Sequence, residues 1–372
     1  MPEYYIDTND IAHLEGFEDF PKLRKNYFVV NMLQGTGDSM PTASTNINFL
    51  KDVKSYHKFC IINIAGEANP CVNLPEYQTS FFQYYEQIHK QSEKYYYPLD
   101  KIILFTSNLN EQQAYDAWRE NNNITAKFHI WLWSPLMRHI KKFDHNLQNE
   151  NPQKKFLCLN KGADQFKHHR TYLNYLIYKN NLQDDFFLSF DTVTKKGFGS
   201  YLNNKANIDY ELVTELSTLD PITFATDDDF IFGCPKEQVS KSLVSIVTET
   251  HHISYSYAVL DYTEKTFKPI LWKHPLLIFG AEGSNTSLGK LGFKSYEGLF
   301  GDLYWDSISN QIERYNTAFE NIQQLNQITI NELSEAVNGI QDVIDYNYEY
   351  LVNDTFYQTQ KEKFIDWINE KY

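Results

Sequence analysis

Cysteine, basic residues and long apolar runs are all scarce in this sequence. Its 372 residues include 4 cysteines, and 34 lysines and arginines stand against 48 aspartates and glutamates, which gives a net charge of −14. A sequence-independent hold on nucleic acid or anionic lipid depends on clustered cations. The acidic balance therefore argues against such binding, although it does not exclude a local basic cleft.

No segment approaches the ~18 uninterrupted apolar residues that a membrane-spanning helix needs. The first ten residues, MPEYYIDTND, also lack the basic and apolar regions of a secretory signal. We therefore expect a cytoplasmic protein without a membrane span.

The cysteines are Cys60, Cys71, Cys158 and Cys234, which lie too far apart for a CxxC metal site. Two of them stand inside apolar runs, KFCIINI and KFLCLN. Because buried cysteine behaves as a small hydrophobic residue, we expect buried thiols rather than metal ligands or disulfides.

Apolar and aromatic residues, by contrast, are abundant. They make up 42% and 16% of the chain, far above the content of a disordered protein. A chain of this length also exceeds the roughly 100–200 residues of one domain. We expect a globular protein with two domains.

In the first 150 residues, short apolar runs alternate with amphipathic segments. The runs predict strands at 26–33, 58–64, 101–107 and 127–133, and helical spacing predicts helices at 78–94 and 110–122. Strands that are apolar on both faces, with helices between them, indicate a parallel sheet. We therefore predict a first α/β domain over residues 1–150.

The polar, proline-containing segment LQNENPQKK (147–155) is the predicted linker. Beyond it, the same alternation predicts a second α/β domain over residues 151–308. From about residue 309 the pattern becomes helical, with apolar spacing at 309–325, 329–351 and 356–370. We expect the segment 309–372 to brace the two domains.

The most informative stretch is YTEKTFKPILWKHPLLIFGAEGSNTSLGKLGF, residues 262–293. Thr263 can cap a helix whose first turn holds Glu264 and Lys265, and a helix start is a natural seat for a diphosphate. Lys265 can add a charge to that phosphate, and Glu264 can accept hydrogen bonds from both hydroxyls of a ribose. Ordinary helix capping with a solvated lysine explains the same residues.

This stretch resembles the donor-binding segment of GT-B glycosyltransferases, especially the fucosyltransferase and exostosin-like branch. From TEKTFKPILWKHP through LGKLGFKSYE it also resembles glycosyltransferase-like proteins of bacteriophages and large viruses. The resemblance covers residues 155–300 and hardly extends into the N-terminal half. It implies two Rossmann-like domains that face a cleft, an acceptor domain over 1–150, a donor domain over 151–308, and host cytoplasm if the source is viral.

The segment KFLCLNKGADQFKHHR (155–170) matches the family's first donor-domain strand, which ends here at Asn160, and a following basic residue, here Arg170. The planar fork of Arg170 suits a diphosphate, although it also fits the basic face of an ordinary helix. The family places a Val-x-Glu strand end near the sugar, as Glu249 stands here beside His251 and His252. The expected donor-binding residues are Arg170, Asn160, Glu249, Tyr262, Thr263, Glu264, Lys265 and Lys268.

An inverting enzyme of this type needs a general base from the acceptor domain. Asp38, in the loop QGTGDSM, and Glu67, in the loop AGEANPC, are the candidates by position, and we favour Glu67 because Pro70 stiffens its turn. Both also suit ordinary turns. Gly35 and Gly37 lack the Lys-Ser/Thr of a phosphate loop.

The run TDDDF (226–230) offers an alternative, because an Asp-x-Asp pair can hold manganese and a donor diphosphate. Its place two-thirds along the chain favours a solvated loop, so we expect neither a bound metal nor a cofactor besides the nucleotide-sugar donor.

The sequence thus predicts transfer of a sugar to an acceptor hydroxyl, on a glycan or on a hydroxymethylated base in viral DNA. DNA binding would need a basic cleft, for which the available cations are Lys22, Arg24, Lys25, Arg138, Lys141 and Lys142. The alternative is a non-catalytic module on a degenerate glycosyltransferase fold that binds a carbohydrate or a protein partner. Nucleotide binding distinguishes the two.

Overall fold

The computed structural model describes residues 27–31, 50, 59–63, 78–133, 147, 151–160, 168–190, 208–226, 233–249 and 260–371. The chain divides into two compact units. The first comprises Met1–Arg138, Tyr255–Asp261 and Phe356–Tyr372, and the second comprises His139–Ser254 and Tyr262–Thr355. Each unit is an α/β structure with a four-stranded parallel sheet, as the apolar runs predict.

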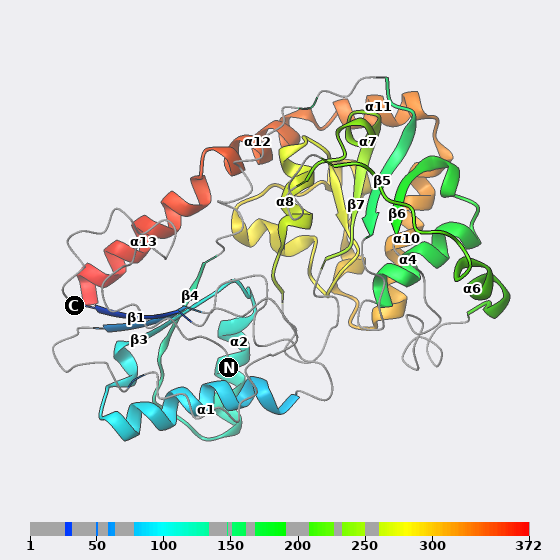
Figure 1. The fold of residues 1–372 in the computed structure, drawn as a ribbon. Coiled ribbons are helices and arrows are strands. Elements are labelled where there is room, and N and C mark those ends of the chain that lie inside the picture. Colours follow the sequence, from blue (N-terminus) through cyan, green and yellow to red (C-terminus); the bar gives the residue numbers. More distant parts are fainter. Residues whose placement is uncertain are drawn as a thin grey trace. The chain divides into compact units, whose positions relative to one another are not determined.

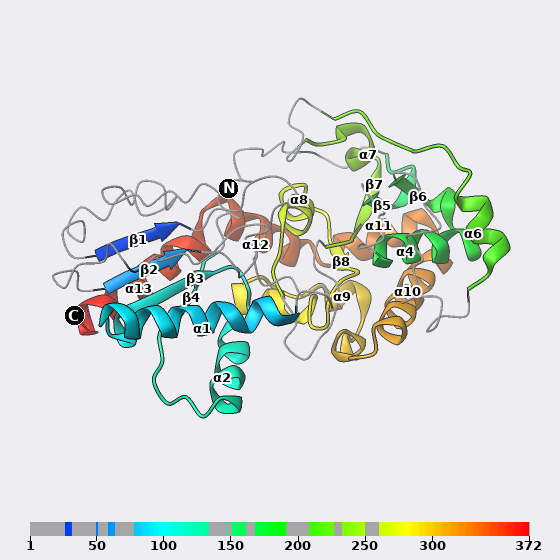
Figure 2. The same cartoon turned by 60° about the horizontal axis from the view of Figure 1, so that its bottom comes forward.

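In the first unit the strand order is β1-β2-β3-β4, with all neighbours parallel (Figures 1 and 2). The described elements are β1 (Tyr27–Asn31), β2 (Phe59–Asn63), α1 (Gln78–Tyr95), the short 3-10 helix η3 (Leu99–Lys101), β3 (Ile102–Thr106), α2 (Glu111–Asn121), β4 (His129–Leu132) and α13 (Thr355–Lys371).

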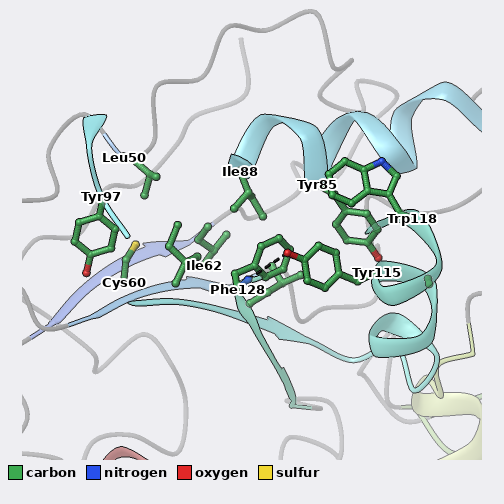
Figure 3. Close-up of a cluster of buried hydrophobic side chains, with 12 residues drawn as sticks. Leu50, Cys60, Ile62, Tyr85, Ile88, Tyr97, Tyr115, Trp118 and Phe128 are labelled. Carbon is green, nitrogen blue, oxygen red and sulfur yellow. Dashed lines mark hydrogen bonds between the residues drawn. The ribbon is translucent and has the colours of Figure 1, made fainter. Parts of the chain in front are cut away.

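Helices α1 and α2 lie on one side of this sheet (Figures 1 and 2). Alternate residues of β2 and β3 face them, and their side chains meet aromatic residues of the helices in a buried cluster (Figure 3). The rings of Tyr115 and Phe128 stack there with centroids 3.9 Å apart, and the Tyr115 hydroxyl accepts a hydrogen bond from the Phe128 amide. This face of the sheet is a closed aromatic core.

The opposite face of the same sheet carries α13. Phe105 of β3 packs edge-on against Phe364, with centroids 5.2 Å apart, and Trp133 packs against Tyr357 at 4.9 Å. The strands are therefore apolar on both faces because helices cover both faces.

A buried carboxylate organises the carboxyl end of β3. Glu111 is fully buried and accepts hydrogen bonds from the Tyr85 hydroxyl (2.6 Å) and from the side chains of Asn108 (3.1 Å) and Thr106 (3.3 Å). The Asn108 side-chain oxygen in turn accepts the Leu260 amide at 2.9 Å. This network ties residue 260 to the first unit.

In the second unit the strand order is β6-β5-β7-β8, again with all neighbours parallel. The described elements are β5 (Lys154–Asn160), α4 (His168–Lys179), η5 (Gln183–Asp185), β6 (Phe186–Phe190), α6 (Tyr210–Leu216), α7 (Lys236–Ser240), β7 (Ser242–Val247), α8 (Glu264–Leu271), β8 (Leu276–Ile278), η7 (Thr286–Leu291), α9 (Glu297–Phe300), η8 (Tyr304–Ser307), α10 (Gln311–Gln327), α11 (Ile330–Asn338) and α12 (Gln341–Val352).

Helix α8 packs on β7 and β8, α11 packs on β5 and β7, and α4 contacts α6 and α10. The segment 329–351, predicted as one helix, is divided into α11 and α12 at Gly339. Glycine is a weak helix former. Ile340, the N-cap of α12, packs closely on Gly298. A Cβ atom added at Gly298 would lie only 2.8 Å from the Ile340 side chain. The division therefore has a packing cause.

Among the helices that the structure describes, none is both long and apolar enough to cross a bilayer.

His274 is a fully buried histidine that precedes β8. Its Nδ1 and the Ser245 hydroxyl of β7 are 3.1 Å apart, and burial lowers the pKa of His274 to about 4. The folded protein therefore holds this imidazole neutral at pH values where an unfolded histidine, with a pKa near 6.5, becomes charged.

We predict that this burial makes the protein less stable in mild acid. As the pH falls from about 6.5 to 4, the unfolded state binds a proton at His274 that the folded state does not bind. This difference lowers the free energy of unfolding by about 3 kcal/mol at pH 4. The measurement is the free energy of unfolding against pH for the wild type and for His274→Asn. Parallel curves for the two proteins would contradict the prediction.

Candidate functional site

The candidate site lies in the second unit, where the carboxyl ends of the parallel strands meet the start of α8. Such strand ends are the usual place for ligands in α/β sheets. Thr263 is the N-cap of α8, and its hydroxyl accepts the Lys265 amide at 3.4 Å. The predicted cap at Thr263 is therefore confirmed.

Glu249, which follows β7, holds this helix start in place. It is 1% exposed, and its carboxylate accepts the Thr263 amide (3.1 Å), the Thr263 hydroxyl (2.7 Å) and the Thr266 hydroxyl. The sequence predicted Glu249 as a residue that lines the donor pocket. The structure shows its carboxylate buried beneath the helix, where it supports the first turn of α8.

Asn160, the last residue of β5, lies in a second buried polar network. Its side-chain amide donates to the Asn174 side chain at 3.0 Å, and its oxygen accepts the Thr248 hydroxyl. On the neighbouring helix α4, His169 Nε2 lies 2.7 Å from the Glu249 carbonyl oxygen. These contacts fix the ends of β5 and β7 against the start of α4.

Arg170 has a different environment from the one the sequence suggests. A basic residue on the outer face of a helix would be solvated, but Arg170 is 2% exposed and donates a long hydrogen bond of 3.5 Å to the Thr248 carbonyl. Arg170 also acts on Cys158 of β5. Burial raises the pKa of the Cys158 thiol to about 12, and the positive charge of Arg170 partly opposes that rise. Arg170 is thus a buried cation at the carboxyl end of the sheet.

The first turn of α8 carries two charged side chains, of which Glu264 is buried and Lys265 is half-buried. Glu264 Oε1 lies 2.6 Å from Lys265 Nζ. Burial opposes ionisation of Glu264, but the ammonium groups of Lys265 and Lys268 outweigh it and hold the pKa of this carboxyl below its ordinary value. Glu264 is 7% exposed. Its other oxygen, Oε2, is buried and has no hydrogen-bond partner.

Tyr262, directly before the N-cap of α8, contacts the turn that follows β8. It is 3% exposed, and its hydroxyl donates to the Ser284 carbonyl at 2.7 Å. The turn at Ser284 is held by Asp306, whose carboxylate accepts the amides of Asn285 (2.9 Å) and Thr286 (2.8 Å). Tyr262 therefore has a supporting role in this structure.

A cavity of about 210 Å³ opens at the carboxyl ends of β5 and β6. Of the predicted donor-binding residues, Asn160 and Lys268 line it, together with hydroxyl, aromatic and apolar side chains. The further lining residues are Leu159, Ser189, Phe190, Ile222, Thr223, Phe224, Thr226, Gly233 and Pro235. Sequence reasoning missed the wall at 222–226, which is held beside β6 by a two-way backbone hydrogen-bond pair between Phe190 and Ile222.

Sequence reasoning also missed the partners that support the site, namely Thr248, Thr266, Asn174 and Asp306. Only Thr266 carried a usable signal, because it stands three residues after the cap Thr263 and therefore shares its side of the helix. The other three contact residues that are distant in the sequence.

Several predicted residues lie outside the described part of the chain. They are the base candidates Asp38 and Glu67, the pair His251 and His252, the acidic run at 227–229, and the cations Lys22, Arg24, Lys25, Arg138, Lys141 and Lys142. Their assignments stay predictions. Within the residues that are described, no three His, Cys, Asp or Glu side chains gather as a metal site would require.

Comparison of the chain with protein-family models, with curated proteins and with solved structures gave no match.

We predict that Glu249→Gln lowers stability by about 2 kcal/mol or more, because an amide cannot accept all the hydrogen bonds that the carboxylate accepts. The measurement is the free energy of unfolding, with Glu335→Gln on the exposed face of α11 as the matched control. The control should stay within about 0.5 kcal/mol of the wild type. Unchanged stability in Glu249→Gln would contradict the supporting role.

Proposed function

We propose that the protein is a nucleotide-sugar-dependent glycosyltransferase of GT-B type, and that the start of α8 binds the donor. The observation that carries the proposal is Glu264 Oε2, a buried carboxylate oxygen without a hydrogen-bond partner. A buried charged acceptor is costly unless it is fully hydrogen-bonded. A ligand hydroxyl at this position would remove that cost.

The cations around this oxygen support an anionic ligand. Lys265 stands in the first turn of α8, where the backbone dipole also favours negative charge, and Lys268 stands in the last turn of the same helix. Lys268 lines the cavity at the ends of β5 and β6. A nucleoside diphosphate carries both kinds of group, a diphosphate for the cations and ribose hydroxyls for Glu264.

The size of the cavity supports partial enclosure of such a ligand. Its volume of about 210 Å³ is below the roughly 300–1,000 Å³ of pockets that enclose a whole small molecule. One ring of the ligand would enter among Ser189, Thr223 and Phe224, and the phosphates would remain at the mouth beside Lys268.

Catalysis would combine positioning, stabilisation of the leaving diphosphate and assistance by a general base. Arg170, Lys265 and Lys268 would supply positive charge, and the first unit would act as the acceptor domain across a cleft. Glu67 or Asp38 would take the proton of the acceptor hydroxyl. The acceptor would be a glycan or a hydroxymethylated base in viral DNA; a base in a duplex would first have to flip out.

The second candidate is a non-catalytic module that binds a carbohydrate or a protein partner. Its support is a set of exposed tyrosines, among them Tyr304 at 65% and Tyr210 at 58% exposure, because aromatic faces stack on sugars. That role requires neither Glu264 nor Lys268.

We predict that Lys268→Ala weakens binding of UDP or GDP by about ten- to a hundredfold, which is the loss of one charge-assisted contact. Calorimetric titration measures the affinity, and Lys290→Ala, the same charge change at an exposed residue of η7, is the control. Equal nucleotide affinity in Lys268→Ala and the control would contradict the donor site. A wild type that binds sugars but no nucleotide would favour the second candidate.

We further predict that sugar transfer continues in the presence of EDTA, because protein cations neutralise the leaving diphosphate. The assay is turnover with and without the chelator. Activity that EDTA abolishes and manganese restores, and that Asp227→Asn or Asp229→Asn lacks, would contradict the GT-B assignment and favour a metal-dependent site.

A further inference from the structure

Three half-buried aromatic side chains meet between β4 and the last turns of α13 in the first unit. They are His129 and Trp131 of β4 and Trp367 of α13, and we call them the aromatic seam. The ring centroids of His129 and Trp367 lie 4.8 Å apart, and those of Trp131 and Trp367 lie 5.9 Å apart. The seam lies where the carboxyl end of α13 meets the start of β4 (Figures 1 and 2). It is one surface of rings that are partly open to solvent.

Buried side chains beneath the seam hold its two indoles in place. Phe364 of α13 is fully buried, and its ring centroid lies 5.0 Å from that of Trp131 and 6.1 Å from that of Trp367. Phe364 in turn packs edge-on against Phe105 of β3. A ligand that stacks on the indoles therefore meets rings that are already ordered, which reduces the entropic cost of binding.

Lys371 places a positive charge at one end of the seam. Its ammonium group donates a hydrogen bond to His129 Nε2 and lies 5.1 Å from the centre of the Trp367 ring. Burial and the charge of Lys371 lower the pKa of His129 below its ordinary value of 6.5. The imidazole is therefore neutral at pH 7, and the hydrogen-bond partner of the ammonium carries no negative charge.

This neutral partner makes the ammonium of Lys371 available to an anion. Lys265 and Lys273 are each paired with a carboxylate, and an anion that displaced such a carboxylate would leave its charge uncompensated. Displacement of a neutral, half-buried imidazole leaves no charge behind. The other charges that act on Lys371 are those of Asp100 and Lys127, which have opposite signs and partly cancel.

Stacking rings beside a cation suit a pyranose sugar that carries a carboxylate. The C–H bonds on one face of such a sugar pack on the electron-rich face of an indole, and the carboxylate accepts a charge-assisted hydrogen bond from the ammonium group. Single-stranded nucleic acid also stacks on aromatic rings, but it brings a phosphate with every base. The cations that act at the seam are Lys371 and Lys127, and the net charge of the chain is −14, which disfavours a polyphosphate.

We propose that the aromatic seam and Lys371 form a binding site for acidic carbohydrates. Trp131 and Trp367 stack on the sugar ring, and Lys371 binds its carboxylate. His129 Nε2, once Lys371 has turned to the ligand, accepts a hydrogen bond from a sugar hydroxyl. The site uses neither α8 nor the cavity of the second unit, so it does not rest on the proposed nucleotide site.

The experiment is calorimetric titration of the full chain with tetragalacturonate, with cellotetraose as a neutral saccharide, and with single-stranded oligothymidylate. The variants are Lys371→Ala, Trp367→Ala and the conservative Trp367→Phe. The controls are Lys363→Ala, the same charge change at an exposed residue of α13, and Tyr304→Ala, which removes an exposed ring from the second unit. The free energy of unfolding of each variant shows whether it is folded.

The wild type should bind tetragalacturonate about tenfold more tightly than cellotetraose, the worth of a hydrogen bond between charged groups. Lys371→Ala should lose that preference and keep its affinity for cellotetraose. Trp367→Ala should bind both saccharides several-fold more weakly because it lacks a stacking ring, and Trp367→Phe should recover part of the loss. Both controls should behave as the wild type does.

Three results would overturn the inference. They are a wild type that binds neither saccharide, a wild type that binds the oligothymidylate alone, and a preference for tetragalacturonate that survives in Lys371→Ala. If Trp367→Ala does not fold, Lys371→Ala and Trp367→Phe still decide the question. None of these results changes the test of the nucleotide site, which depends on Lys268→Ala.

Discussion

The hydrogen bonds from the start of α8 to the buried carboxylate of Glu249 are the contact on which the candidate site depends. One carboxylate satisfies a free backbone amide of the helix start and two threonine hydroxyls. Hydrogen bonds to an ionised acceptor are about twice as strong as neutral ones. Glu264, Lys265 and Lys268 are all on the helix that this contact holds, so their positions at the end of the sheet follow from it.

The first unit uses the same device at its own sheet. Glu111 is fully buried at the carboxyl end of β3 and collects hydrogen bonds from Tyr85, Asn108 and Thr106. In each unit, then, a buried glutamate fixes the backbone that follows a strand. In the second unit, a cavity of about 210 Å³ lies at the ends of β5 and β6, and Lys268 of α8 is among its lining residues.

The strands and most helices were predictable from the sequence because their signal is local. Strands that are buried on both faces appear in the sequence as continuous apolar runs, such as KIILFTS for β3. Thr263 is a typical N-cap residue, which predicts the start of α8. Burial of polar residues was not predictable. The local sequence around Glu249 and Arg170 carries no sign of their burial, because that burial depends on contacts with Thr263 and Thr248, which are 14 and 78 residues away. The helix break at Gly339 likewise depends on the distant Gly298.

The central claim is that the start of α8 binds a nucleoside diphosphate, and a crystal structure of the protein with UDP or GDP tests it most directly. The account predicts phosphate oxygens within hydrogen-bond distance of Lys265 or Lys268, ribose hydroxyls on the carboxylate of Glu264, and a ring in the cavity beside Asn160. A nucleotide bound elsewhere, with the Glu264–Lys265 ion pair intact, would contradict it.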